Sequence, residues 1–171
     1  MKSRDIAIVG ILLAVGAILR YFLAMLHTPL TPNMIIAFYC LGIILVRPRV
    51  GEALGIGIVA GLLSMLISSS IFPPANLVSE PVGALVCFGL YRLLGERTGS
   101  PAATTFVSTL ASGFTFAAVA LVAVAPKILA KYSTVFGFVL VFVPIVVVTA
   151  VFNALVVQIL SYPARRVLSR V

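Results

Sequence analysis

Long apolar runs, each about as long as a bilayer-spanning helix, constrain this chain more than any other feature of its sequence. A helix needs about 20 predominantly apolar residues to cross the hydrocarbon core of a membrane. Of the 171 residues, 62% are hydrophobic and 9% are charged, whereas about a quarter of a soluble domain is charged. A water-soluble fold of this composition would expose large apolar patches. We therefore expect a single membrane domain, residues 1–171, surrounded by the lipid of the plasma membrane.

Breaks between the apolar runs divide the chain into six predicted helices. Prolines mark most of the breaks, as in Arg47-Pro48-Arg49 and Phe72-Pro73-Pro74. A helix beginning at Pro81 rather than at residue 75 is the alternative for the fourth span, because a proline inside a helix removes a hydrogen bond. The fifth helix is expected to end before Pro126. The fold class is all-α with six transmembrane helices, at approximately residues 6–26, 32–46, 50–71, 75–94, 101–125 and 133–162.

Basic residues fall on alternate sides of the predicted membrane. The outer loops contain Lys127 and Lys131, whereas the other side holds Lys2, Arg4, Arg47, Arg49, Arg92, Arg97, Arg165, Arg166 and Arg170. Cytoplasmic loops carry the excess of lysine and arginine, so we expect both termini to be cytoplasmic. These residues occur singly or in pairs without a basic stripe or interleaved aromatic residues, and the sequence therefore does not predict nucleic-acid binding.

A few polar side chains interrupt the apolar runs, and because the bilayer penalises such groups, function in membrane proteins concentrates at them. Arg20 lies about six residues inside the first helix; its guanidinium could reach the outer surface or could bind a carboxylate in a pocket. Glu80, near the outer end of the fourth helix, requires a cation, which is either Arg20 or a substrate amine. Asn153 is expected to form an interhelical hydrogen bond rather than to bind a ligand.

Small residues follow one face of two predicted helices, where they allow close helix packing. In the third helix, Gly51, Gly55, Gly57 and Gly61 are expected to pack within the molecule. In the first helix, such a face could pack internally or could dock another membrane subunit; it consists of Ala7, Gly10, Ala14 and Ala17.

Motifs of catalysis and nucleotide binding are missing from the sequence. It contains no GxxxxGK[ST], HExxH or GxSxG pattern and no paired catalytic carboxylates. Cys40 and Cys87 lack the spacing of metal ligands. We therefore predict neither an enzyme nor a metal or cofactor. A self-contained channel or secondary transporter would need a polar path, and the cytoplasmic halves of the helices are nearly all apolar.

Three stretches resemble a known family, the S components of energy-coupling factor (ECF) transporters, and the closest likeness is to the tryptophan-type S components. The stretches are Thr31-Pro32-Asn33-Met34 leading into residues 41–45, the glycine-rich residues 55–64, and the segment from Pro74 to Pro81. The likeness covers roughly residues 5–95. The family usually has lysine where this chain has Glu80 and often histidine where it has Arg20, which leaves the substrate open.

This resemblance implies a substrate-binding membrane subunit that takes its substrate from outside and docks on a membrane scaffold subunit attached to two cytoplasmic ATPases. Tryptophan or a related aromatic zwitterion is the expected substrate, with its carboxylate on Arg20 and its amine on Glu80. A vitamin or other micronutrient on the same fold, and a non-transporting membrane scaffold, are the alternatives. The expected docking face is the small-residue face of the first helix, and the expected substrate-binding residues are Arg20, Asn33, Phe72, Asn76, Glu80 and Tyr132.

Overall fold

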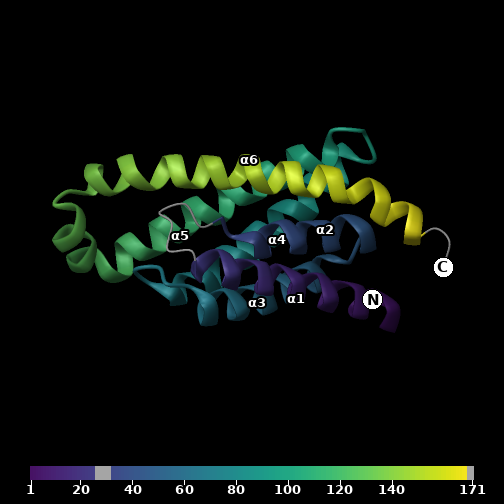
Figure 1. Ribbon diagram of the computed structural model, residues 1–171, viewed down its shortest axis with the longest axis horizontal. Helices are drawn as coiled ribbons and strands as arrows, with labels where there is room; N and C mark the ends of the chain where they lie inside the picture. Colours follow the sequence, from purple (N-terminus) through teal and green to yellow (C-terminus); the bar gives the residue numbers. More distant parts are fainter. Residues whose placement is uncertain (26–31, 169–171) are drawn as a thin grey trace.

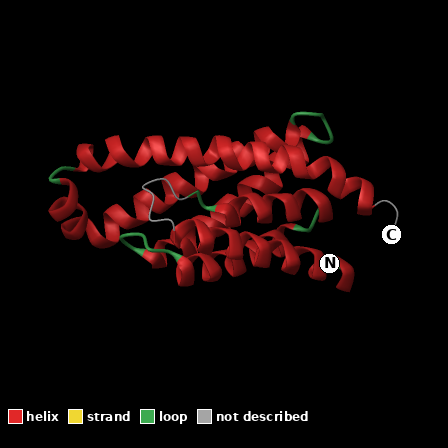
Figure 2. Ribbon diagram, viewed as in Figure 1, coloured by secondary structure: helices red, strands yellow, loops and turns green. Residues whose placement is uncertain are grey.

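The computed structural model describes residues 1–25 and 32–168. These residues form helices and no strands (Figure 2), which confirms the all-α class. Leu26 at the predicted end of the first helix, Thr31 in the family resemblance and the basic residue Arg170 lie outside the described residues. The helices are α1 (Ser3–Met25), α2 (Met34–Val46), α3 (Val50–Ile67), a 3-10 turn η1 (Pro73–Ala75), α4 (Asn76–Leu94), α5 (Ser100–Tyr132) and α6 (Val135–Leu168).

Apolar side chains cover much of the outside of the bundle. Leu66 is 77% exposed and Val122 is 89% exposed, and most of the other large exposed side chains on α1, α3, α5 and α6 are also aliphatic or aromatic. All of the helices except α2 are long and apolar enough to cross a membrane. An apolar exterior of this extent is stable in lipid, which does not penalise it.

The short helix α2 is the centre of the bundle. It has 13 residues, and 11 of them, Met34 to Ile44, are buried. At 1.5 Å per residue this helix is about 20 Å long, shorter than the roughly 30 Å hydrocarbon core. Because neighbouring helices cover it on all sides, it is apolar all round and needs no lipid-facing stripe.

Proline shapes α4 and α5 without ending them. The turn η1 leads into α4 at Asn76, and α4 continues through Pro81. The prediction that the fifth helix ends at Ala125 differs from the structure, because α5 bends at Val124 (φ −138°, ψ 33°) and continues to Tyr132. The ring of Pro126 clashes with the carbonyl group four residues earlier, and this distorts the helix locally. The fixed φ of proline then suits the first turn of the resumed helix.

Glycine allows α3 and α4 to approach each other closely. A Cβ atom on Gly57 would lie 2.6 Å from the Pro81 Cα atom, and one on Gly61 would lie 2.8 Å from the Asn76 carbonyl oxygen. A Cβ atom on Gly51 or Gly55 would meet nothing within 4 Å. Only half of the predicted glycine face of this helix therefore packs against α4.

The start of α1 and the end of α6 lie at the same end of the bundle, called here the end with the termini (Figure 1). Basic residues of this end join elements that are distant in sequence: Arg165 donates a hydrogen bond to the Tyr91 hydroxyl group, and Arg47 forms an ion pair with Glu96. The turn between α5 and α6 lies at the opposite end (Figure 1). The assignment of the end with the termini to the cytoplasm stays a prediction.

Candidate functional site

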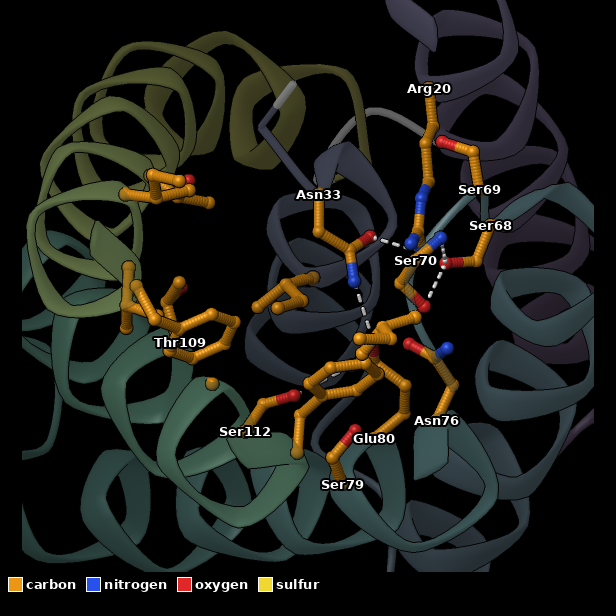
Figure 3. Close-up of a pocket in the computed structure, with 18 of the residues that line it drawn as sticks. Arg20, Asn33, Ser68, Ser69, Ser70, Asn76, Ser79, Glu80, Thr109 and Ser112 are labelled. Carbon is orange, nitrogen blue, oxygen red and sulfur yellow. Dashed lines mark hydrogen bonds between the residues drawn. The ribbon is translucent and has the colours of Figure 1, made fainter. Parts of the chain in front are cut away.

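A pocket of about 360 Å³ lies in the half of the bundle away from the termini. Side chains from α1, α4, α5 and α6, from Asn33 before α2 and from the α3–α4 connection line it (Figure 3). Small-molecule sites in proteins measure roughly 300–1,000 Å³. This pocket therefore has room for a compact ligand.

A chain of three polar residues forms one wall of the pocket. The Arg20 Nη1 atom donates a hydrogen bond to the Asn33 Oδ1 atom at 2.8 Å, and the Asn33 Nδ2 atom donates to the Glu80 Oε1 atom at 2.6 Å. Figure 3 shows Asn33 between the two charged groups. No direct ion pair joins Arg20 to Glu80. One amide therefore links the two opposite charges, which are not in direct contact.

Glu80 is fully buried, with 0% of its surface exposed. Besides the Asn33 amide, the Ser112 hydroxyl group donates to its Oε2 atom at 3.1 Å, and the Ser64 hydroxyl group lies 3.4 Å from its Oε1 atom. These donors are neutral, and no described cation forms an ion pair with Glu80. A buried carboxylate without a cation carries a large desolvation cost. A ligand cation in the pocket would offset that cost.

The connection between α3 and α4 forms the polar rim of the pocket. The Asn76 Nδ2 atom donates to the Pro73 carbonyl oxygen at 2.7 Å, which fixes the 3-10 turn before α4. The Ser68 hydroxyl group donates to the Ser70 hydroxyl group at 2.8 Å. Because these bonds are local, the connection has a defined shape where it borders the pocket.

An aromatic wall completes the pocket. Phe138 and Phe142 stack with ring centroids 5.1 Å apart, Phe116 and Phe142 stack at 6.1 Å, and Tyr132 meets Phe138 edge to face at 5.4 Å. All four residues line the pocket. Aromatic rings prefer offset-stacked or edge-to-face neighbours. This wall, on α5 and α6, therefore suits a flat aromatic ligand.

The pocket collects most of the residues that were predicted from sequence to bind the substrate. Arg20, Asn33, Asn76, Glu80 and Tyr132 line it, and Lys131 joins them at its edge. Phe72 is different: it packs against the apolar cluster that contains Phe116, Phe138 and Ile128 and is not among the lining residues. Sequence reasoning did not single out Ser79, Thr109, Ser112, Phe116, Lys131, Phe138 or Phe142. These residues are polar or aromatic side chains of α4, α5 or α6. The sequence does not show which of them face a common pocket, because this depends on how the three helices pack.

Asn153 supports the site from behind. Its Nδ2 atom donates to the Asn33 carbonyl oxygen at 3.1 Å and lies 3.4 Å from the Thr109 hydroxyl oxygen. The side chain is fully buried and does not line the pocket. The expected interhelical hydrogen bond is present, and it joins α6 to α5 and to the start of α2.

A row of buried hydroxyl groups runs along α5 from the end with the termini to the pocket. The hydroxyl groups of Ser108 and Thr109 donate to carbonyl oxygens four residues earlier, whereas those of Thr104 and Thr105 have no hydrogen-bond partner among the described residues. The sequence predicted helices that are nearly all apolar in the half that carries the termini, and this prediction is wrong for α5. Sequence inspection missed the row, which consists of Ser100, Thr104, Thr105, Ser108, Thr109 and Ser112.

The predicted docking face of α1 divides into two parts. Ala7, Gly10 and Ala14 are exposed, and a Cβ atom on Gly10 would meet nothing within 4 Å. Ala17 is half-buried and packs against the core cluster of α2, α3 and α4. The small residue that brings α1 close to α2 is instead Gly16, where a Cβ atom would lie 3.0 Å from the Phe38 Cβ atom.

No group of three potential metal ligands occurs within residues 1–25 and 32–168. Cys40 and Cys87 are buried as free thiols. The polar and aromatic groups that line the pocket are a guanidinium group, the Lys131 ammonium group, a carboxylate, amides, hydroxyl groups and aromatic rings.

Comparison with known proteins matches this chain to a transport family. The sequence model of the family described as "Tryptophan transporter TrpP" matches residues 2–168. The "Probable tryptophan transport protein" of Bacillus subtilis (strain 168) is 32% identical over 169 residues, which cover 95% of this chain and 91% of that protein. No solved structure matches the chain. These matches confirm the resemblance that rested on residues 5–95. With five helices able to cross a membrane, they also confirm the predicted multi-pass protein of the plasma membrane.

Proposed function

This chain belongs to the tryptophan transporter family TrpP, and from that membership we propose that it takes up tryptophan and binds it in the pocket between α1, α4, α5 and α6. The observation that carries the proposal is the placement of two opposite charges beside an aromatic wall. Tryptophan has the matching groups, which are a carboxylate, an ammonium group and a flat indole ring.

In the proposed complex, the α-carboxylate binds to Arg20 and the α-ammonium group binds to Glu80. A guanidinium group has five N–H donors, and Arg20 uses one of them on Asn33. The remaining donors can hold a carboxylate through two parallel bonds. Glu80 gains the cation that its burial requires, and the two charged groups of the ligand span the same gap as Asn33.

The indole ring then lies against Phe138 and Phe142, with Tyr132 at the edge. A stacked aromatic pair contributes about 0.5–1.5 kcal/mol beyond the burial of its surface. An aliphatic amino acid would keep both charged contacts and lose the stacking. We expect the aromatic wall to set the preference for tryptophan, and the charged residues to set the requirement for a free amino acid.

We also propose that partner subunits supply the energy, as the resemblance to S components implies. The expected partners are a membrane scaffold subunit and two ATPases. The exposed small residues Ala7, Gly10 and Ala14 support a close contact of α1 with another membrane helix. Purification of the tagged chain from its native membrane tests this point, because recovery without ATPase subunits would argue for another energy source.

Calorimetric titration of the purified protein with tryptophan tests the binding site. Arg20→Gln is expected to weaken tryptophan binding at least about tenfold, because a charged hydrogen bond contributes about 1.5–3 kcal/mol. Tryptamine, which lacks the carboxylate, should bind both proteins equally. Arg97→Gln is the matched control, because Arg97 is exposed in the α4–α5 loop. Wild-type protein that binds no tryptophan would overturn the proposal.

A further inference from the structure

A second cavity, of about 560 Å³, lies between the α2–α3 turn and the C-terminal end of α4. The α2–α3 turn and the end of α4 lie at the end of the bundle where α1 begins, and the α5–α6 turn near the candidate substrate pocket lies at the other end (Figure 1). Ile43, Pro48 and Phe88 give the second cavity a buried or half-buried apolar lining. Charged residues also line it, so we call it the arginine cavity; they are Arg47, Arg49, Arg92 and Glu96.

Positive charge exceeds negative charge around the arginine cavity. Glu96 forms an ion pair with Arg47. Neither Arg49 nor Arg92 is in an ion pair with any carboxylate of residues 1–25 and 32–168, although the Arg92 guanidinium carbon lies 5.9 Å from the centre of the Phe88 ring. The nearest carboxylate to Arg49 is that of Glu52, whose Oε2 atom accepts the Arg49 backbone N–H group at 2.6 Å and not its guanidinium group. The guanidinium groups of Arg49 and Arg92 therefore border the apolar cavity without a direct ion pair among the described residues.

The backbone of Arg47 is unusual for its residue type. Arg47 ends α2 in the left-handed conformation (φ 50°, ψ 60°), and its N–H group donates to the Ile43 carbonyl oxygen at 2.9 Å. Glycine or asparagine commonly takes this position, because a larger side chain is unfavourable there. In this chain the position directs a guanidinium group over the Tyr91 ring, 6.0 Å from its centre. The same backbone position holds this guanidinium group in its ion pair with Glu96 at the edge of the cavity.

We propose that the arginine cavity binds an anionic phospholipid of the surrounding bilayer. The phosphate group would lie between Arg49 and Arg92, since guanidinium groups bind phosphate oxygens in pairs. The glycerol and the start of the acyl chains would lie on the apolar lining of Ile43 and Phe88. Basic pockets between membrane helices bind anionic headgroups in this way. The cavity is lined by residues at the ends of α2 and α4, where membrane-spanning helices are expected to reach the lipid headgroups.

The test compares two double variants that lower the net charge by the same amount. Arg49→Gln with Arg92→Gln removes the two unpaired charges of the cavity, whereas Arg97→Gln with Lys127→Gln removes two exposed charges outside it. Detergent-purified protein is titrated with phosphatidylglycerol, phosphatidylcholine or inorganic phosphate. Native mass spectrometry counts the bound lipid, and the thermal unfolding midpoint reports stabilisation, because ligands that bind the folded state raise it.

Wild-type protein and the exposed-charge variant are expected to bind phosphatidylglycerol about tenfold more tightly than phosphatidylcholine, and the cavity variant should lose this preference. Tryptophan affinity should be equal in all three proteins. Equal binding of the two lipids by wild-type protein, or equal loss in both variants, would overturn the proposal. An equal effect of inorganic phosphate would assign the cavity to a free anion instead. If the cavity variant does not fold, wild-type protein is titrated with each lipid at low and high salt. High salt should then weaken the binding of phosphatidylglycerol and leave that of phosphatidylcholine unchanged; an equal effect on both lipids would overturn the proposal.

Discussion

Replacing Glu80 with glutamine separates the binding role of this residue from its structural role. Glutamine has nearly the same shape and removes the charge. The Glu80 side chain is fully buried and accepts hydrogen bonds at 2.6 Å from Asn33 and at 3.1 Å from Ser112. Loss of one partner from a buried charge pair costs about 2–5 kcal/mol. Because Arg20 and Asn33 are only half-buried, water screens this site, and we expect the lower part of that range.

The expected loss of tryptophan affinity in Glu80→Gln is therefore about 2–3 kcal/mol, or about 30- to 150-fold in Kd. Stability without ligand should change little, because the lost charged hydrogen bonds and the relieved desolvation of the carboxylate have opposite signs. We expect the unfolding midpoint of the unliganded protein to stay within about 3 °C of the wild type. Calorimetry and thermal unfolding of the same detergent-purified samples measure the two effects.

Two ligand analogues make the assay specific. Indole-3-propionate lacks the ammonium group and should bind wild-type protein and Glu80→Gln with about equal affinity. Tryptamine retains the ammonium group and should lose as much affinity as tryptophan. Glu96→Gln is the charge-matched control at the other end of the bundle. If tryptophan and indole-3-propionate lose affinity equally in Glu80→Gln, Glu80 acts by positioning Asn33 and Arg20, and the proposed contact with the ammonium group is refuted.

Two further predictions concern packing and the aromatic wall. Gly57→Ala should destabilise the protein by about 1–3 kcal/mol, because its Cβ atom would lie 2.6 Å from the Pro81 Cα atom. Gly55→Ala, whose Cβ atom would lie in open space, should leave the thermal unfolding midpoint unchanged or slightly raised. Equal midpoints for the two variants would contradict the packing of α3 on α4. Phe142→Leu should weaken tryptophan binding about three- to tenfold in calorimetry through the loss of stacking. Phe136 is 73% exposed on the same helix, and Phe136→Leu should have no effect. Unchanged affinity in Phe142→Leu would show that the aromatic wall does not bind tryptophan.

The sequence predicted that Arg20 and Glu80 would lie together in a pocket, because lipid makes isolated polar residues conspicuous, but it did not predict Lys131 there. Arg20, Asn33 and Glu80 interrupt apolar runs, and each lines the pocket. The interposed Asn33 amide could not be predicted, because the distance between two charges depends on how α1, α2 and α4 pack.

Of the aromatic wall, the sequence predicted Tyr132 and missed the three phenylalanines, for a different reason. Phe138 and Phe142 face the pocket, whereas Phe136 on the same helix is exposed to the lipid side. In a membrane both environments are apolar, so the residue type does not reveal the direction of the side chain. The hydroxyl row of α5 was missed because serine and threonine can bond to their own helix and need no partner elsewhere.

Arg20, the residue proposed to bind the carboxylate of the substrate, lies on α1, the most peripheral helix. Helix α1 has 23 residues and buries Val9, Leu13 and Gly16, whereas 11 of the 13 residues of α2 are buried. A small tilt of α1 would carry the Arg20 guanidinium away from Asn33 and leave Glu80 and the stacked phenylalanines in place. If tryptophan binds as proposed, such a movement would release its carboxylate, and it would also shift Val9, Leu13 and Gly16 where they pack in the core. A partner that contacts α1 from the lipid side and shifts it is therefore expected to change the affinity of the pocket for tryptophan.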